Sequence, residues 1–291
     1  MTTHTEAEIA SQPACWRRAI ENVPSGALPR PGERVAVVGC GTSWFIAMAY
    51  ATLRERAGLG ETDAFAASET PVGRRYDHVL ALTRSGTTTE VLDLLGRTTA
   101  SRTTAITADP GTPITSVAGQ VIVLDYADER SVVQTRFATT QLALLRASLG
   151  EDLGQAVADA ERAVSAPLDR ELVEAEQITF LGAGWSVGLA HEAALKMREA
   201  SRSWTEAYPA MEYRHGPISI AGPGRVTWMF GEAPGGLREQ VEATGGGFRE
   251  SGLDPMAELV MAQRVSVARA FARGLNPDEP LHLTRSVILS S

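Results

Sequence analysis

The chain has almost no lysine. Lys196 is the only lysine among its 27 lysine and arginine residues. Wherever a positive charge alone is sufficient the chain uses arginine, so the single lysine suggests a position that needs a compact amine able to lose its proton. Basic runs are also absent, and the formal net charge is −8. We therefore expect no nucleic-acid partner.

Cysteine and long apolar runs are equally scarce. The two cysteines, Cys15 and Cys40, show neither metal-binding nor redox spacing, which favours a reducing compartment. No stretch approaches the roughly 18 consecutive apolar residues of a membrane-spanning helix, and the first residues lack a basic start followed by an apolar core. With 44% hydrophobic and 21% charged residues, the composition predicts a globular cytoplasmic protein with no membrane partner.

The stretch 191–217, HEAALKMREASRSWTEAYPAMEYRHGP, places the lysine among other groups capable of acid–base chemistry. Glu192, Lys196 and Glu199 fall at i, i+4 and i+7, so a helix would present them on one face. The Gly-Pro dipeptide predicts a turn directly after His215. Other interpretations remain open: the Glu-Lys pair could be an ordinary surface pair, worth roughly 0.2–0.5 kcal/mol, and the histidine could be a simple turn residue.

Short apolar strands alternate with helices along most of the chain. This pattern predicts an α/β fold with parallel sheets covered by helices on both faces. A long helical region is expected at 131–170 and an amphipathic helix at 258–273. The predicted strands are 34–38, 64–67, 78–83, 103–107, 121–124, 177–181 and 225–230, with a short final strand or extended tail at 286–289.

An internal repeat indicates two related domains. VVGCGTS at 37–43 and FLGAGWS at 180–186 both stand between a predicted strand and a predicted helix. The shared G-x-G-x-S pattern in the same setting favours two homologous α/β domains. The predicted division is an N-terminal segment at 1–30, a first domain at 31–165 and a second at 166–291 that includes the C-terminal tail. We expect the second domain to be trimmed, because the sequence predicts no strand in 245–256.

A run rich in hydroxyl groups, LTRSGTTTE at 82–90, joins a strand end to a helix start. Backbone N–H groups and the positive end of a helix dipole would face outward here, an arrangement that suits a phosphate monoester without a lysine. Ligands of open α/β sheets bind at the carboxyl ends of strands, where both this run and 41–43 are predicted to lie. Alternatively, these hydroxyl groups could simply cap a helix.

Together these segments resemble the sugar isomerase (SIS) family, in particular the isomerase half of glucosamine-6-phosphate synthase and related phosphosugar isomerases and deaminases. The resemblance covers roughly 30–291 as tandem SIS domains. ALKMREASRSWTEAYPAMEYRHGPISI is its most specific part, and GCGTS at 39–43, TRSGTT at 83–88 and LTRSV at 283–287 match further family segments in order.

The resemblance implies a role for each matched residue. Glu199 would move a proton between the two carbons of an enediol intermediate, His215 would assist ring opening from a partner subunit, and Lys196 would lie near the substrate oxygens. These types suit the chemistry, since a carboxylate can remove a proton beside a carbonyl while donors stabilise the oxygens. The residues implied to bind phosphate and sugar are Gly41, Thr42, Ser43, Thr83, Arg84, Ser85, Thr87, Thr88 and Arg285.

The sequence also departs from the family pattern. The tail lysine of the family is Arg285 here, and arginine can neither form an imine nor act as a neutral base at ordinary pH. Thr83 and Arg84 stand where the family has serine and glutamine, and Thr87 replaces its usual acid. The sequence has no amidotransferase domain with an N-terminal cysteine, so glutamine-dependent transfer by this chain alone is not expected.

The resemblance, together with the departures from it at Arg285 and in the trimmed second domain, suggests three functions. The first is a phosphosugar aldose–ketose isomerase or amino-sugar-phosphate isomerase/deaminase that uses an enediol intermediate. The second is a fructosamine-phosphate deglycase, and the third is a non-catalytic sensor that binds a sugar phosphate. The resemblance implies no metal or organic cofactor. It implies a homodimer with a shared active site if His215 serves the neighbouring subunit.

Overall fold

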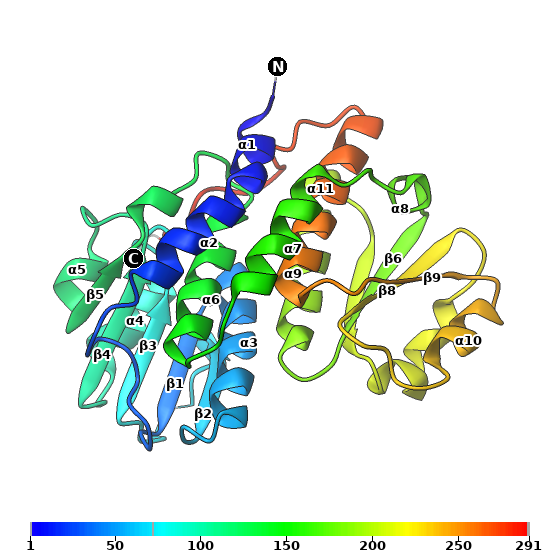
Figure 1. Cartoon of the computed structure of the whole chain (residues 1–291). Helices are drawn as coiled ribbons and strands as arrows, with labels where there is room; N and C mark the ends of the chain where they lie inside the picture. Colours follow the sequence, from blue (N-terminus) through cyan, green and yellow to red (C-terminus); the bar gives the residue numbers. More distant parts are fainter. Residues whose placement is uncertain (1, 72, 290–291) are drawn as a thin grey trace. The chain divides into compact units, whose positions relative to one another are not determined.

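The computed structural model describes residues 2–71 and 73–289, and contacts divide them into two compact units (Figure 1). The five-stranded unit comprises residues 14–153 and 282–289, and the four-stranded unit comprises residues 2–13 and 154–281. The border at 153/154 differs from the predicted border near 165, because α7 (Gly154–Ser165) packs on α11 (Pro255–Ala272) of the four-stranded unit. The tail from residue 282 groups with the five-stranded unit.

A wholly parallel sheet forms the centre of the five-stranded unit. Its strand order is β2-β1-β3-β4-β5. The central strands β1 and β3 are buried along their whole length, as expected of parallel strands covered on both faces. The strands are β1 (Val35–Gly39), β2 (Thr62–Ala66), β3 (His78–Leu82), β4 (Arg102–Thr107) and β5 (Gln120–Val123).

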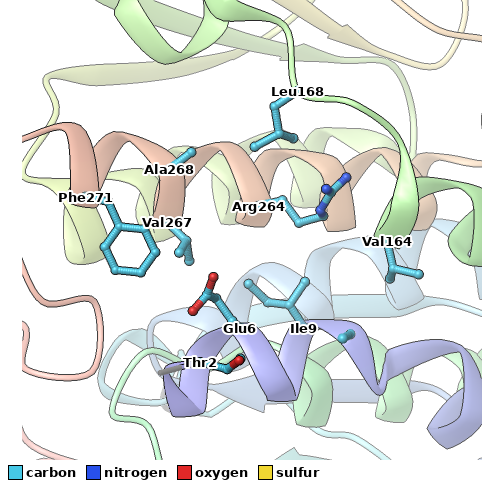
Figure 2. Close-up of a pocket in the computed structure, with 10 residues that line it drawn as sticks. Thr2, Glu6, Ile9, Val164, Leu168, Arg264, Val267, Ala268 and Phe271 are labelled. Carbon is cyan, nitrogen blue, oxygen red and sulfur yellow. The ribbon is translucent and has the colours of Figure 1, made fainter.

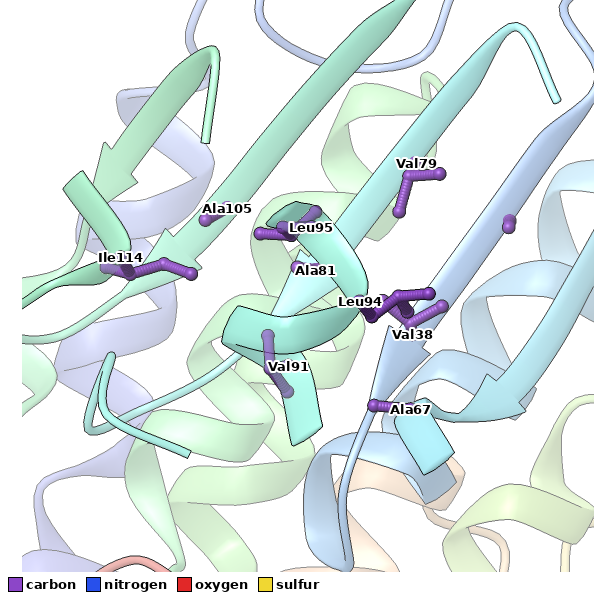
Figure 3. Close-up of a cluster of buried hydrophobic side chains, with 10 residues drawn as sticks. Val38, Ala67, Val79, Ala81, Val91, Leu94, Leu95, Ala105 and Ile114 are labelled. Carbon is purple, nitrogen blue, oxygen red and sulfur yellow. The ribbon is translucent and has the colours of Figure 1, made fainter. Parts of the chain in front are cut away.

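One face of this sheet packs against α4 (Thr89–Arg97), as Figure 3 shows. Alternate strand residues point to this face and meet apolar residues at i, i+3 and i+4 of the helix. The buried cluster consists of Ala36, Val38, Ala67, Val79, Ala81, Val91, Leu94, Leu95, Ala105 and Ile114. The remaining helices of the unit are α2 (Gln12–Glu21, whose first two residues group with the other unit), α3 (Thr42–Arg56), α5 (Ile114–Val117) and α6 (Arg136–Ser148), with 3₁₀ turns η1 (Ala67–Glu69) and η2 (Asp125–Ala127).

The four-stranded unit repeats this plan with a smaller parallel sheet. Its strand order is β7-β6-β8-β9. The strands are β6 (Gln177–Gly182), β7 (Thr205–Pro209), β8 (Arg225–Phe230) and β9 (Gly247–Glu250). Its helices are α1 (His4–Ala10), α7, α8 (Arg170–Glu174), α9 (Ser186–Ser201), α10 (Leu237–Glu242) and α11, with 3₁₀ turns η3 (Glu212–His215) and η4 (Pro217–Ile220).

Two layers cover the four-stranded sheet. On one face α11 packs against α9, and Glu258 of α11 accepts a hydrogen bond from the indole of Trp228 on β8. The neighbouring strand residue Met229 points to the opposite face. There it joins Tyr213 of η3 and Leu237 of α10 in a separate buried cluster.

The predicted α/β fold with parallel sheets flanked by helices is confirmed, and the second sheet is the smaller one. Several element predictions were wrong. The sequence missed β7 and β9 because both are short edge strands with mixed polar residues, and β9 lies inside the region predicted to lack strands. Of the two alternatives for 286–289, the short strand is absent and the extended tail remains. The helical region predicted at 131–170 divides into α6, α7 and the start of α8.

The G-x-G-x-S repeat has a steric cause. In both units the helix after the first strand begins so close to the strand end that only glycine fits there. A Cβ on Gly39 would lie 2.6 Å from Cβ of Ser43, and one on Gly182 would lie 2.4 Å from the carbonyl oxygen of Ser186. Side chains at these positions would force the helix off the sheet.

We expect Gly39→Ala and Gly182→Ala each to lower the free energy of unfolding by roughly 1–3 kcal/mol, because the added methyl group must displace backbone. Gly96→Ala is the matched control, since Gly96 is an exposed residue of α4 with nothing within 4 Å of a new Cβ. That change should raise stability by about 0.5–1 kcal/mol. Urea unfolding measures all three, and equal effects would contradict the proposed close approach.

Glu258 makes the stability of the four-stranded unit depend on pH. Its side chain is 1% exposed and accepts hydrogen bonds from Trp228, at 2.5 Å, and from Ser251. Burial raises the pKa of this carboxyl from 4.5 to about 7, although the Trp228 hydrogen bond and the charge of Arg249 act in the opposite direction. The folded protein therefore holds a proton that the unfolded chain has already released between pH 4.5 and 7.

Because the unfolded chain binds fewer protons in this window, the contribution of Glu258 to stability should fall as pH rises from 4.5 to 7 and then level off. The loss amounts to about 3 kcal/mol at most. A Glu258→Gln variant cannot titrate, so its unfolding free energy should lack this decline when both proteins are unfolded in urea at pH 5 and pH 7. Parallel pH profiles would show that Glu258 is ionised when folded.

Candidate active site

The loops that follow β1 and β3 begin at neighbouring positions on the carboxyl edge of the five-stranded sheet. The connection after β1 leads to β2 on one side, whereas β3 leads to β4 on the other side. Such a reversal of strand order marks the position where open parallel α/β sheets bind ligands. The structure brings the residues predicted for phosphate binding to this edge, on two loops: Gly41, Thr42, Ser43, Thr83, Arg84, Ser85, Thr87 and Thr88.

Residues 83–88, termed here the hydroxyl loop, form a compact turn. Thr83 and Ser85 are 3% and 7% exposed. The hydroxyl of Thr83 accepts a hydrogen bond from the N–H of Gly86 at 3.3 Å, and that of Ser85 accepts one from the hydroxyl of Thr87 at 3.1 Å. Gly86 has a φ of 64°, and a Cβ there would lie 2.0 Å from the hydroxyl of Thr112. Glycine is therefore required in the middle of the loop.

Two helices begin at this edge, α3 directly after Gly41 and α4 directly after Thr88. Within the described residues, the hydroxyl group of Thr88 accepts no hydrogen bond from α4, and Gly41 has no side chain with which to cap α3. The alternative that the hydroxyl group of Thr88 caps α4 is therefore wrong. First-turn N–H groups at such helix starts, together with hydroxyl groups, make a suitable environment for an anion.

Arg84 lies in the hydroxyl loop, but its guanidinium is 5% exposed and binds protein groups. It pairs with the carboxylate of Glu129 at 3.4 Å and donates to the carbonyl oxygens of Ser131 and Val132. It also donates to the carbonyl oxygen of Arg285 in the tail at 3.1 Å. The predicted phosphate ligand thus has four partners within its own unit.

Arg285 is likewise bound to protein groups. Its guanidinium forms an ion pair with the carboxylate of Asp128 and donates to the carbonyl oxygen of Glu129. Sequence reasoning gave no role to either acidic residue. Glu129 is 2% exposed and also binds the N–H groups of Thr135 and Arg136 at the start of α6. No capping pattern could have revealed this, because the carboxylate reaches over six and seven residues rather than three.

Lys196 lies in the four-stranded unit, on α9, and is 1% exposed. Its ammonium group makes a short hydrogen bond to the carboxylate of Glu199 and lies 3.6 Å from Oε1 of Glu192. The side chain of Glu192 is fully buried and that of Glu199 is 18% exposed. The Glu192–Lys196 pair is therefore not a surface pair. A buried ammonium needs such carboxylates to offset the cost of leaving water.

Two further basic side chains lie on α9 near Glu192, Lys196 and Glu199. Arg198 donates to the carbonyl oxygen of Thr205 at 3.1 Å, and burial lowers its pKa while Glu199 and Glu192 raise it. Burial, and to a lesser extent the charge of Arg198, lowers the pKa of His191. Both effects favour the neutral form of this histidine, which lies on the second turn of α9.

His215 lies on η3 and is exposed. The connection from β6 to β7 contains α9, and the connection from β7 to β8 contains η3 and runs back across the sheet in the opposite direction. Right-handed crossovers of opposite direction lie on opposite faces. Among the described residues His215 forms no hydrogen bond or ion pair with Lys196 or Glu199. The structure thus joins the two α9 residues but separates them from His215 of the same unit.

A cavity of about 330 Å³ lies elsewhere in the four-stranded unit, between α1, the end of α7 and α11 (Figure 2). Its walls are mainly apolar, with Ile9, Val267 and Phe271 among them, and Glu6 and Arg264 supply polar groups. It contains none of the residues predicted for catalysis or phosphate binding. Two of the donated hydrogen bonds of Arg264 go to the carbonyl oxygens of residues 163 and 166.

Within residues 2–71 and 73–289, every helix is too short or too polar to span a membrane. The same residues contain no group of three or more histidine, cysteine, aspartate or glutamate side chains arranged to hold a metal ion.

The sequence is similar to that of known enzymes, although no protein-family model matches it. It is 27% identical over 293 residues to glutamine–fructose-6-phosphate aminotransferase (isomerizing) of Sulfolobus acidocaldarius. The match covers 87% of this chain and 50% of that enzyme. The chain therefore spans about half the length of the curated relatives it matches.

Solved structures share the fold over nearly the whole chain. Glucosamine-6-phosphate deaminase from Thermotoga maritima matches with a TM-score of 0.82 and 25% identity, and the match covers 99% of this chain and 100% of the deaminase. The C-terminal domain of glucosamine-fructose-6-phosphate aminotransferase from Francisella tularensis matches with a TM-score of 0.79 and 20% identity, covering 96% and 99% of the two chains. The second likeness supports the fold alone.

These matches agree with the motif resemblance. The chain is thus similar, over most of its length, to about half of an isomerizing glutamine–fructose-6-phosphate aminotransferase and to a whole glucosamine-6-phosphate deaminase.

Proposed function

We propose that the chain acts on a phosphorylated sugar or amino sugar, as an aldose–ketose isomerase or an amino-sugar-phosphate isomerase/deaminase that works through an enediol intermediate. The observation that carries this proposal is the buried Lys196–Glu199 pair. It sets a partly exposed carboxylate beside a buried amine on the helix whose sequence matches the family motif. The similarity to a glucosamine-6-phosphate deaminase and a fructose-6-phosphate aminotransferase supports a hexose phosphate as substrate.

The phosphate group would bind at the carboxyl edge of the five-stranded sheet. Ser43, Thr83, Ser85 and Thr88 would supply hydroxyl groups there, and the starts of α3 and α4 would contribute the positive ends of their helix dipoles. A phosphate held by neutral donors and helix dipoles requires no lysine, which accords with the near absence of lysine from the chain. Gly41, Thr42 and Thr87 complete the two loops.

Glu199 would carry the proton. Its carboxylate would remove a proton from the carbon next to the sugar carbonyl and return it to the neighbouring carbon, which turns an aldose into a ketose through the enediol. Lys196 would stabilise the negative charge that develops on the substrate oxygens, and its own burial strengthens that interaction. With Glu192 held against the same amine, Lys196 is positioned from two sides.

His215 would assist ring opening from a second copy of the chain. Its place on the face of the sheet opposite α9 supports this, because the histidine of one chain does not meet Glu199 of the same unit. We therefore propose a cytoplasmic homodimer with shared active sites. We also propose that the two units are tandem SIS domains, since each has a G-x-G-x-S loop between the central strand and the helix after it.

Glu199→Gln should lower kcat about 10²–10⁴-fold, because the amide cannot accept the proton. The assay offers glucose, fructose and glucosamine 6-phosphates and measures ketose, aldose and ammonia, so that isomerisation and deamination are told apart. The control is Glu174→Gln, which removes an exposed carboxylate of α8 and should leave the rate unchanged. Full activity of the Glu199 variant, or no conversion of any sugar phosphate by the parent protein, would refute the proposal.

Mixed dimers test the shared site. Glu199→Gln and His215→Ala proteins should each be nearly inactive, whereas an equal mixture should recover about a quarter of the parental activity, because half of the dimers are hybrids with one intact site each. Subunit exchange is verified by native mass spectrometry with one variant isotopically labelled. Complete exchange without recovery would mean that both residues serve the site from one chain.

A further inference from the structure

The C-terminal tail lies along the hydroxyl loop and the start of α4. The hydroxyl groups of Ser286 and Thr87 are 2.9 Å apart, and the N–H of Thr89 donates to the carbonyl oxygen of Val287 at 3.2 Å. The N–H of Leu289 in turn donates to the hydroxyl of Thr89 at 3.0 Å. The tail thus contacts residues that the proposed function assigns to the phosphate site or that adjoin it.

Two arginines hold this arrangement in a reciprocal way. The backbone carbonyl of Arg285 accepts a hydrogen bond from Arg84, while the side chain of Arg285 reaches Asp128 and the carbonyl oxygen of Glu129. Arg84 in turn pairs with the carboxylate of Glu129. Both arginines therefore connect the tail to the segment 128–132. The side chain of Arg84 binds this segment and the backbone of the tail, and the side chain of Arg285 reaches the segment from the tail itself.

The terminal nitrogens of both guanidinium groups are bonded to protein groups. The two terminal nitrogens of Arg84 have four acceptors between them, and the side chain is buried. Both terminal nitrogens of Arg285 are also bonded. The positive charges are offset locally by Asp128 and Glu129, so these arginines would add little to the attraction of a phosphate.

We propose that Arg84 and Arg285 are positioning residues, which fix the tail and the hydroxyl loop in the shape that binds the substrate, rather than ligands of the substrate. Only the kinetic consequence of this inference rests on the proposed function. It replaces the substrate-binding role that the family resemblance implies for both residues. The tail side chain then takes no part in the reaction, and Arg285 is not a substitute for a catalytic lysine.

Hydrogen exchange of the full-length chain, followed by mass spectrometry, tests the contact directly. Arg285→Gln and Asp128→Asn should each speed exchange at least tenfold in 87–92 and 284–289, and the double variant should be no faster than either single one, because all three lose the same ion pair. Arg97→Gln removes an exposed arginine at the end of α4 and should change nothing. Unchanged exchange in both single variants, or multiplied effects in the double variant, would overturn the proposal.

Kinetics separate positioning from catalysis. Arg285→Gln should raise KM for the sugar phosphate at least fivefold while kcat stays within twofold, since the reacting groups are untouched. A tenfold fall in kcat with KM unchanged would place Arg285 at the reacting carbons and overturn the inference. If the parent protein converts no sugar phosphate, the proposed function fails, and the exchange measurement alone then decides whether the arginines hold the tail.

Discussion

The burial of one ammonium group is the constraint on which the candidate active site depends. Lys196 is enclosed on α9, and an isolated buried charge would be far too costly to retain. Glu192 and Glu199, one turn before and one turn after it, offset that cost. Of the two carboxylates only Glu199 retains an exposed edge, so the same packing that stabilises the lysine leaves one carboxylate able to meet a substrate. Charge compensation and the proposed chemistry thus involve the same three residues.

In the proposed function, the five-stranded unit would recognise the anionic phosphate by different means. Its hydroxyl loop and helix starts lie at the point where the strand order reverses. The two arginines of this region bind carbonyl oxygens and carboxylates and so serve to hold the loop and the tail. A chain of net charge −8 can bind a phosphate in this way without a basic surface, because short-range donors replace long-range attraction.

Periodicity and repeated motifs revealed much of this from the sequence. The i, i+4, i+7 spacing correctly placed Glu192, Lys196 and Glu199 on one helix face, and the glycine repeat marked the two strand–helix junctions. Burial was not visible, because a buried and an exposed Glu-Lys pair have the same spacing. Nor was the role of Glu129, whose carboxylate binds groups contributed by residues from 84 to 136. Such contacts depend on how loops meet in space, and no local pattern encodes them.

Proton transfer by a carboxylate through an enediol leaves an isotopic trace when a hexose 6-phosphate is converted in D₂O and deuterium in the product is located by NMR. We expect deuterium on the carbon next to the carbonyl, because a proton held by the partly exposed Glu199 exchanges with solvent before it is returned. A product formed in full without any deuterium on carbon would rule out this mechanism and indicate direct hydride transfer between the two carbons.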